Sequence, residues 1–425
     1  MRTKRLTGFA AVAIISLSIA ACGSDNNESS SSVGATTPPA TETDSTTAPD
    51  TAAPDTAAPP DTAAPDTAAP DTTGGDLAGL ELAQARLDEF TKPITDLGMT
   101  DTVPVPAGLK VAYVQCSVPV CESIKQGIAE AVDAIGGTLE TFPTQDTADT
   151  VQAAFQAAVQ SEPDMVMTSG NPREWFEDSL AELNDKSIPV VGWSIPEPYI
   201  TDGFAANLIT GDDYFFNGVL MADYVTAKTE GKANVLYLNI PQFPVLGLEG
   251  DGFRGEMEAA CDGCKVTSLE FTVEQLIAGE HISAAISEFQ KDPDINFLVT
   301  GFGDMLLGMP DALSGIDVDV PAISQAGTPA NYQLIADGQL QVADVALPTG
   351  LLGWRAVDAG LRAIAGQDPG SFEHRPFTDI DGHPDINITG VPLAILGADD
   401  ISDPTIAWPG MDGYQDVFKA LWILG

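Results

Sequence analysis

The residues of this 425-residue chain best suited to covalent or metal chemistry are its five cysteines and three histidines. Four cysteines form two local pairs, Cys116 with Cys121 and Cys261 with Cys264. Such pairs fit disulfides in an exported protein, zinc ligation by four thiolates, or a redox CxxC motif for the second pair. We favour disulfides for both pairs. The first spacing is loose for zinc, and the second pair follows a helical run, whereas a redox CxxC belongs at the start of a helix.

Other catalytic signals are weak. His281, His374 and His383 are scattered, so no catalytic or metal triad is readable. Residues 379–385, Asp-Ile-Asp-Gly-His-Pro-Asp, carry alternating oxygen ligands that suit Ca²⁺ but lack the glutamate of an EF-hand, and we interpret them as a solvated turn. The sequence contains no P-loop and no recognisable nucleophile–base pair. We therefore expect no catalytic residue, metal or cofactor, and a role other than that of an enzyme.

The N-terminus has the features of an export signal. Residues 2–5 are mostly basic and residues 8–21 are apolar, a run too short to span a membrane as a helix. Residues 19–22, Ile-Ala-Ala-Cys, resemble the bacterial lipobox, which implies a diacylglyceryl group on Cys22 and firm membrane attachment. The alternative is an ordinary secreted protein that is cleaved near Ala21. We predict a signal peptide over residues 1–22.

Residues 23–76 consist mostly of Ser, Thr, Ala, Pro and Asp, with Pro-Asp-Thr-Ala-Ala as a recurring unit. They contain too little apolar surface to offset the entropy cost of ordering. We predict an extended, disordered linker that reaches on the order of 150 Å when fully stretched. Such a linker would hold a folded domain away from a membrane.

The charge balance excludes one class of partner. The chain has 18 Lys and Arg against 62 Asp and Glu, a formal net charge of −44. Nucleic-acid binding requires a basic footprint, so we expect no nucleic-acid partner. The simplest interpretation is a solvated acidic surface that favours solubility, and we expect a monomer.

The folded part begins with a clear strand and helix. Residues 111–114 form a short apolar run, typical of a strand covered on both faces. Ile124, Ile128 and Ile135 share one helical face, and two glycines follow as a stop signal. In open α/β sheets ligands bind at the carboxyl ends of the strands. The loop between Cys116 and Cys121 lies at such an end and is expected to form one wall of a binding cleft.

The same alternation of strand and helix continues through two successive series, the pattern of a bilobed α/β protein with parallel sheets. We expect two Rossmann-like lobes joined by a hinge, with the ligand between them. The expected boundaries are a lead-in helix and extended segment over 77–106, lobe 1 over 107–209 plus 349–395, lobe 2 over 210–348, and a C-terminal tail helix within 396–425.

From about Lys110 onward the sequence resembles the type I periplasmic sugar-binding proteins, the ribose- and galactose-binding kind that serves ABC importers. The resemblance rests on the order and spacing of several segments rather than on one motif. These are EPDMVMTS (162–169), SIPVVGW (187–193), GDDYFFNG (211–218), LEGDGFRGEMEA (248–259), TGFGDMLLG (300–308) and AGTPANYQLIADGQLQVADVALP (326–348).

The sequence departs from that family at positions that usually contact the sugar. Gly303, Ala326 and Ala346 stand where polar residues are typical, and the usual cleft arginine near residues 247–249 is missing. A buried hydroxyl without a partner costs about 1–3 kcal/mol. These changes disfavour a standard pentose or hexose but leave the bilobed fold and its closure unaffected.

We select ligand-binding candidates from the ends of strands and the loops that follow them. Trp193 would stack on a ring or a cation, or belong to the core. Asp213 and Asp304 would accept ligand hydroxyls, neutralise a cationic ligand, or cap helices. The full set is Ser117, Asn171, Trp193, Ser194, Asp213, Phe243, Asp304 and Gln325.

The resemblance implies a lipid-anchored extracytoplasmic protein of the bacterial cell membrane. It would capture a small polar solute, sugar-like or related, and deliver it to an ABC permease. The alternative is a receptor of the same fold that signals to a membrane sensor.

Overall fold

The computed structural model describes residues 79–369, 386 and 388–425. All of them belong to one compact unit of the chain. The predicted signal peptide (1–22), Cys22, the linker (23–76), the possible Ca²⁺ loop (379–385), His374 and His383 lie outside the described residues. No helix among the described residues is long and apolar enough to cross a membrane.

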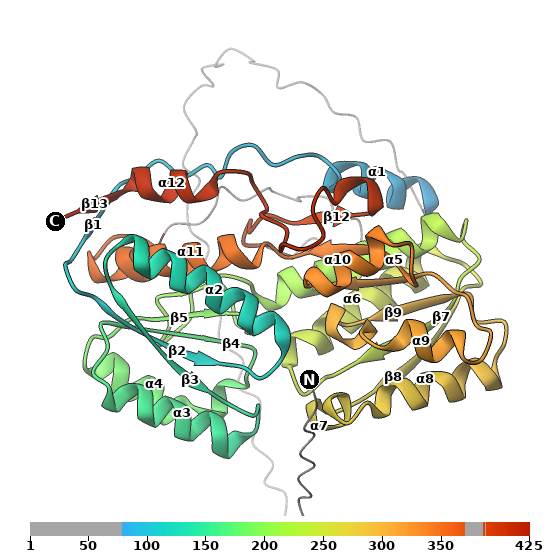
Figure 1. The fold of residues 1–425 in the computed structure, drawn as a ribbon, viewed down its shortest axis with the longest axis horizontal. Helices are drawn as coiled ribbons and strands as arrows, with labels where there is room; N and C mark the ends of the chain where they lie inside the picture. Colours follow the sequence, from blue (N-terminus) through green and yellow to red (C-terminus); the bar gives the residue numbers. More distant parts are fainter. Residues whose placement is uncertain (1–78, 370–385, 387) are drawn as a thin grey trace, which may run out of the picture. The chain divides into compact units, whose positions relative to one another are not determined.

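Lobe 1 is built on a parallel five-stranded sheet of order β3-β2-β4-β5-β6. Its strands are β2 (Lys110–Gln115), β3 (Thr138–Pro143), β4 (Met165–Ser169), β5 (Val190–Trp193) and β6 (Ala206–Asn207). Its helices are α2 (Pro119–Ala134), α3 (Ala148–Gln160), the short 3-10 helix η1 (Arg173–Trp175), α4 (Glu177–Asp185) and α11 (Thr349–Ile364). Helices α2 and α11 cover one face and α3 and α4 the other (Figure 1).

Burial on both faces explains why the central strand β2 carries an unbroken apolar run at residues 111–114, unlike the edge strand β3, which is partly exposed. Val111 and Tyr113 of β2 point toward α2 and α11, whereas Ala112 and Val114 point toward α3 and α4. A side-chain period of two sends neighbours to opposite faces, so a sheet covered twice needs an unbroken apolar run. This confirms the parallel α/β class that the sequence indicated.

Lobe 2 repeats the design with a six-stranded sheet of order β12-β11-β10-β9-β7-β8. Its strands are β7 (Asn234–Asn239), β8 (Lys265–Glu270), β9 (Phe297–Thr300), β10 (Ala322–Gln325), β11 (Gln341–Ala346) and β12 (Ala394–Leu396). The helical segments of this part are α5 (Gly211–Lys228), α6 (Pro244–Ala260), α7 (Val273–Ile277), α8 (Glu280–Lys291), η2 (Gly303–Leu306), α9 (Met309–Ser314), α10 (Pro329–Ala336) and η3 (Ala398–Asp400).

One expected boundary is corrected. We placed residues 349–395 in lobe 1, but Ala394–Leu396 form β12, which pairs antiparallel with β11 of lobe 2. The chain therefore returns to lobe 2 after α11 and covers the otherwise open edge of β11.

Helices α5 and α6 pack closely because glycines remove the side chains between them. A Cβ added at Gly252 would lie 2.1 Å from the carbonyl oxygen of Phe215, whereas one added at Gly255 would meet nothing within 4 Å. Gly252 is thus a contact point of the two helices, and Gly255 on the same helix is not.

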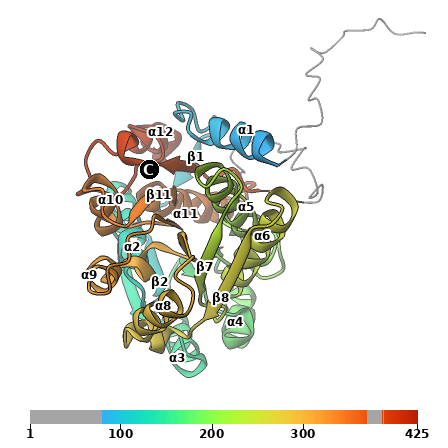
Figure 2. The same cartoon turned by 90° about the vertical axis from the view of Figure 1, so that its right-hand side faces the viewer.

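The lead-in helix α1 (Leu80–Phe90) is tied to lobe 2 by an ion pair. Arg86, which is 6% exposed, donates to Asp223 of α5 at 3.1 Å and to Glu256 of α6 at 2.8 Å. Burial raises the pKa of Asp223 to about 7 despite the attraction of Arg86. Helix α1 lies next to α5 and contacts it (Figure 2), so the lead-in segment is part of the folded unit.

The C-terminal segment completes the described fold. Helix α12 (Tyr414–Leu421) packs on α11, and β13 (Trp422–Leu424) pairs in parallel with β1 (Val103–Val105). The predicted tail helix therefore ends in a strand, whose Trp422 stacks on Trp354 with ring centroids 5.1 Å apart.

Candidate functional site

A cavity of about 60 Å³ lies between the two lobes. In both sheets the strand order reverses next to the first strand, between β2 and β4 in lobe 1 and between β7 and β9 in lobe 2. The crevice at the carboxyl ends of such strands is where open α/β sheets bind ligands. The lining residues are Cys116, Val118, Val120, Cys121, Ile124, Ser169, Gly170, Trp193, Ser194, Tyr214, Phe243, Val245, Leu246, Phe302, Gln325, Ala326 and Leu347.

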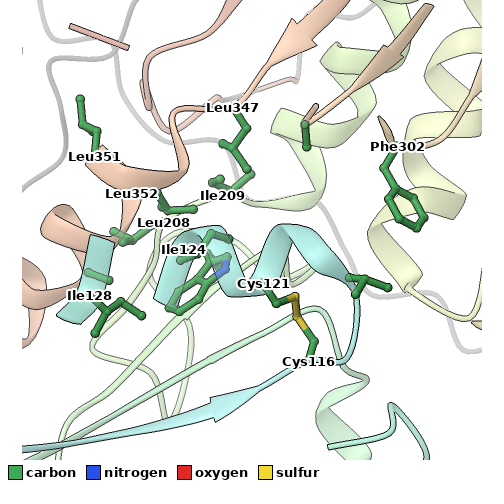
Figure 3. Close-up of a cluster of buried hydrophobic side chains, with 14 of the residues drawn as sticks. Cys116, Cys121, Ile124, Ile128, Leu208, Ile209, Phe302, Leu347, Leu351 and Leu352 are labelled. Atoms are coloured by element: carbon green, nitrogen blue, oxygen red, sulfur yellow. A yellow bond between two sulfur atoms is a disulfide. The ribbon is translucent and has the colours of Figure 1, made fainter. Parts of the chain in front are cut away.

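A disulfide shapes the lobe 1 wall of the cavity. Cys116 follows β2 and is bonded to Cys121 in the first turn of α2, with their Cα atoms 5.8 Å apart. Pro119 occupies the first turn, where its missing N–H costs no hydrogen bond. Figure 3 shows the disulfide between strand end and helix start, with Phe302 of lobe 2 across from it. The expected cleft loop is thus held by a covalent link.

Trp193 lies at the end of β5 and is fully buried. Its ring tilts against Tyr113, with centroids 5.6 Å apart. The indole Nε1 has no hydrogen-bond partner among the described residues. Trp193 therefore belongs to the core, and its ring closes one side of the cavity while its N–H is buried away from water.

Ser194 and Tyr214 form the hinge side of the wall. Ser194 has a left-handed backbone (φ 57°), which is uncommon outside glycine. The Tyr214 hydroxyl donates to Ser194 Oγ at 2.8 Å. Burial raises the pKa of Tyr214, so this hydroxyl stays protonated. Tyr214 was not among the sequence candidates, because its position on α5 is also typical of an aromatic residue in the hydrophobic core.

Lobe 2 contributes two phenylalanines and a glutamine. Phe243 precedes α6, Phe302 follows β9, and Gln325 ends β10. Gln325 Nε2 donates to the Gly301 carbonyl at 2.9 Å, which fixes its amide. Four of the eight candidates thus line the cavity, namely Trp193, Ser194, Phe243 and Gln325.

Ser117 and Asn171 do not line the cavity but support it through a buried carboxylate. Asp146 accepts the backbone N–H and hydroxyl of Ser117 at 2.8 and 2.6 Å. It also accepts the amide of Asn171 at 3.2 Å. Gln242 of lobe 2 donates to the Asp146 carbonyl at 2.7 Å, which joins the two lobes at this point.

Asp213 is a hinge residue rather than a lining residue. It accepts from the backbone N–H and hydroxyl of Thr210 in a capping box at the start of α5. Its other oxygen accepts from the N–H and hydroxyl of Thr389 at 2.8 and 3.1 Å, where the chain crosses between the lobes again. Thr389 also donates to Leu208. Burial raises the pKa of Asp213 although these four hydrogen bonds oppose the shift.

Asp304 links the lobes from behind the lining. Its Oδ2 accepts the Val120 N–H of α2 at 3.4 Å, so a carboxyl group of lobe 2 caps a helix of lobe 1. Its Oδ1 is buried and has no partner in the part of the chain that the structure describes. Burial raises the pKa of Asp304 to about 7.

A second carboxyl group behind the wall, Glu249, escaped the sequence analysis. It is fully buried and accepts from the Tyr237 hydroxyl at 3.1 Å. Burial raises the pKa of Glu249 well above the usual range of a glutamate, which favours its neutral form. In the sequence it reads as one acidic residue of an acidic chain, and only its burial sets it apart.

Other candidate chemistry does not converge on the cavity. Within the described ranges no three His, Cys, Asp or Glu residues come together as metal ligands. Cys261 and Cys264 form a disulfide between α6 and β8, as the sequence indicated. His281 is buried against Phe271 in lobe 2, with ring centroids 6.3 Å apart, away from the cavity lining.

A profile of the periplasmic binding protein domain matches residues 111–368. This match spans more than half of the chain, which therefore belongs to the periplasmic binding protein family. It confirms the family and the fold that the sequence motifs indicated. No curated protein gives a significant match to the sequence.

Solved structures share the fold. An ABC transporter solute-binding protein from Mycobacterium smegmatis with bound glycerol has a TM-score of 0.58 at 17% identity, covering 71% of this chain and 100% of its own. A glucose-galactose binding protein from Geobacillus stearothermophilus has a TM-score of 0.57 at 19% identity, covering 70% and 99%. A 5-methylthioribose transporter solute-binding protein from Thermotoga lettingae, in complex with that compound, has a TM-score of 0.55 at 17% identity, covering 62% and 83%.

Proposed function

We propose that this chain is a membrane-anchored extracytoplasmic solute-binding protein that captures a small polar solute, sugar-like or related, between its lobes and delivers it to an ABC importer. Sugars and their derivatives are the first compounds to test, because structural neighbours are described as binding them. The proposal assigns the chain a binding role and no catalytic step.

The observation that carries the proposal is the position of the cavity. Its walls come from the strand ends at the switch points of both sheets, Cys116 and Ser169 in lobe 1 and Phe243 and Phe302 in lobe 2. A ligand enclosed there touches both lobes at once. Binding then favours the closed arrangement over an open one by its additional contacts.

The connections between the lobes are consistent with a hinge. The chain crosses near residues 208–210 and 347–348, and the return segment is attached to the first crossing by Thr389. Away from these crossings, hydrogen bonds between described residues of the two lobes run from the Val120 N–H to Asp304 and from the Gln242 amide to the Asp146 carbonyl. Such bonds break easily when lobes separate, whereas the hinge bonds can persist.

The anchor and linker are part of the proposal. A lipid on Cys22 and the acidic, proline-containing residues 23–76 would keep the binding domain near the membrane with room to reach a permease. Replacement of Cys22 by Ser is expected to move the protein from the membrane fraction to the medium or the soluble fraction. An unchanged distribution would contradict the lipid anchor.

The binding role is tested by a thermal-shift screen of sugars, polyols, amino acids and quaternary amines. A ligand at 100 times its Kd stabilises the folded state by about 2.7 kcal/mol, which raises the melting temperature measurably. We expect at least one compound class to do so. If no small solute changes the melting temperature, the binding role is refuted.

A measurement of solute uptake distinguishes a role in transport from a role in signalling. Deletion of the gene is expected to abolish accumulation of the bound solute by the cell. Unchanged uptake together with loss of a transcriptional response to the solute would instead favour a sensory role.

A further inference from the structure

Two of the contacts between the lobes differ in whether they can ionise. The side-chain amide of Gln242 in lobe 2 donates to the Asp146 carbonyl of lobe 1 at 2.7 Å and accepts the N–H of Val273 at 3.1 Å. The carboxyl group of Asp304 in lobe 2 accepts the Val120 N–H of lobe 1 at 3.4 Å. The first contact is neutral at every pH, whereas the charge of the second depends on pH.

The closed arrangement gives the Asp304 carboxyl group little in place of water. Its Oδ1 is buried without a partner among the described residues, and its Oδ2 has the single Val120 N–H. The positive end of α2 favours a carboxylate, but the desolvation of a charge with so few hydrogen bonds costs more. Burial raises the pKa of Asp304 to about 7, and the Val120 N–H opposes this shift.

The elements packed around Asp304 do not hold its charge in the closed form. Their titratable side chains, among the described residues, are Glu122 and Lys125 of α2, His281 of α8, Asp311 of α9, Tyr332 of α10 and Asp344 of β11. Lys125 is paired with Glu122. Burial lowers the pKa of His281, which favours its uncharged form. The charge of Asp304 raises the pKa of the buried Asp344, so these two carboxyl groups oppose each other's ionisation.

Opening at the proposed hinge changes the surroundings of this carboxyl group. Val120 belongs to lobe 1 and moves away with it, whereas Phe302 and Asp304 stay on lobe 2. The exposed carboxyl group then ionises closer to its ordinary pKa of 3.8. Because Val120 and Phe302 both line the cavity, a solute is enclosed when this contact forms.

We propose that Asp304 couples closure of the lobes to the uptake of a proton, so that the protein holds its solute more tightly in an acidic medium than in an alkaline one. This inference rests on the proposed function and adds a regulation of the same cavity. A carboxyl group whose pKa is raised in the closed form favours closure fully below about pH 4, and this contribution is lost as the pH rises to about 7. Gln242 contributes equally at every pH.

The closed fraction is measured without solute. Spin labels on cysteines introduced at the exposed Gln156 of α3 and Ser283 of α8 report the separation of the lobes in the full chain by double electron–electron resonance. We expect the ratio of closed to open molecules to fall at least about fivefold between pH 5 and pH 8. The upper limit is about 100-fold, which applies if lobe 1 accounts for all of the burial of Asp304.

Two variants assign the effect. Asp304→Asn still accepts the Val120 N–H but does not ionise, so its closed fraction should not depend on pH. Asp304→Ser, which also cannot ionise, carries the same expectation if the amide variant does not fold. Gln242→Ala removes the neutral contact, and it should lower the closed fraction at every pH while it keeps the parental fall between pH 5 and pH 8.

The outcomes separate this inference from the proposed function. A distance distribution of the parent that is the same at pH 5 and pH 8, or a fall in Asp304→Asn equal to that of the parent, overturns the coupling. Because no solute is present, either result leaves the binding role intact. Absence of any ligand in the thermal-shift screen refutes the binding role, whatever the effect of pH on the closed fraction.

Discussion

The substitution Asp304→Asn tests whether the lobes bury a carboxyl group when they meet. Asp304 is 7% exposed, and one oxygen accepts the Val120 N–H of the opposite lobe. Burial raises its pKa to about 7 from an ordinary value near 3.8. The amide has the same shape and can accept the same hydrogen bond, but it does not ionise.

The direction and the size of the expected change in stability follow from proton linkage. A carboxyl group with a raised pKa binds a proton more tightly in the folded state, so its contribution to stability is present at low pH and is lost as the pH rises from about 4 to about 7. A shift of about 3 pKa units corresponds to about 4 kcal/mol. We therefore compare the free energy of unfolding of Asp304→Asn with that of the parent protein. We expect this difference to rise by up to about 4 kcal/mol in favour of the variant between pH 4 and pH 8.

The assay is urea unfolding followed by circular dichroism at several pH values. The buried carboxyls of Asp223 and Asp344 also have pKa values raised to about 7, but they are present in both proteins and largely cancel in the difference. The charge of Asp304 raises the pKa of Asp344, so its removal acts in the same direction. The control is Asp133→Asn on the exposed face of α2, which should keep the parental pH dependence.

An unchanged pH dependence in Asp304→Asn would refute the reasoning. It would mean that the carboxyl group is solvated in the folded protein and that the contact between Val120 and Asp304 does not close the space between the lobes.

Three further predictions concern the framework of the site. Replacement of both Cys116 and Cys121 by Ser should lower the free energy of unfolding by about 2 kcal/mol from loop entropy, measured by denaturation, and weaken ligand binding; equal stability would show that the link constrains nothing. Gly252→Ala should cost at least about 1–3 kcal/mol because its methyl group meets the carbonyl of α5, whereas Gly255→Ala on the same helix should stabilise by up to about 1 kcal/mol; similar melting temperatures would contradict the close packing of α5 and α6. Arg86→Met should lower the free energy of unfolding by about 3–5 kcal/mol at pH 8 and by less at pH 5, where Asp223, left without its cation, can take up a proton; a cost independent of pH would contradict the buried ion pair.

The sequence predicted the fold well where local pattern decides it. The apolar run at 111–114 and the isoleucine stripe of the following helix gave β2 and α2, because a strand covered on both faces and an amphipathic helix leave distinct periods. The pairing of β13 with β1 was not predictable in the same way. It joins segments at opposite ends of the folded unit, and the residue pattern of neither segment predicts which strand it pairs with.

The residues that line the cavity could be predicted in part from the sequence. Strand ends located Trp193, Ser194, Phe243 and Gln325 on the cavity wall. Asp213 and Asp304 were also predicted to contact the ligand, but neither lines the cavity. Asp213 bonds to Thr389 at the hinge, and Asp304 accepts the Val120 N–H between the lobes. Tyr214 and Phe302 were missed because an aromatic residue on an apolar wall looks like core until the cavity beside it is seen.

The central claim is that two lobes close on a small solute, and the distance between the lobes tests it directly. Spin labels on cysteines introduced at Gln156 of α3 and Ser283 of α8, which are both exposed, report the separation by double electron–electron resonance. Helices α3 and α8 belong to different lobes (Figure 1). With a saturating amount of the solute that gives the largest thermal shift, we predict one short and narrow distance, and a longer or broader distribution without it. The same distribution with and without solute would contradict the account.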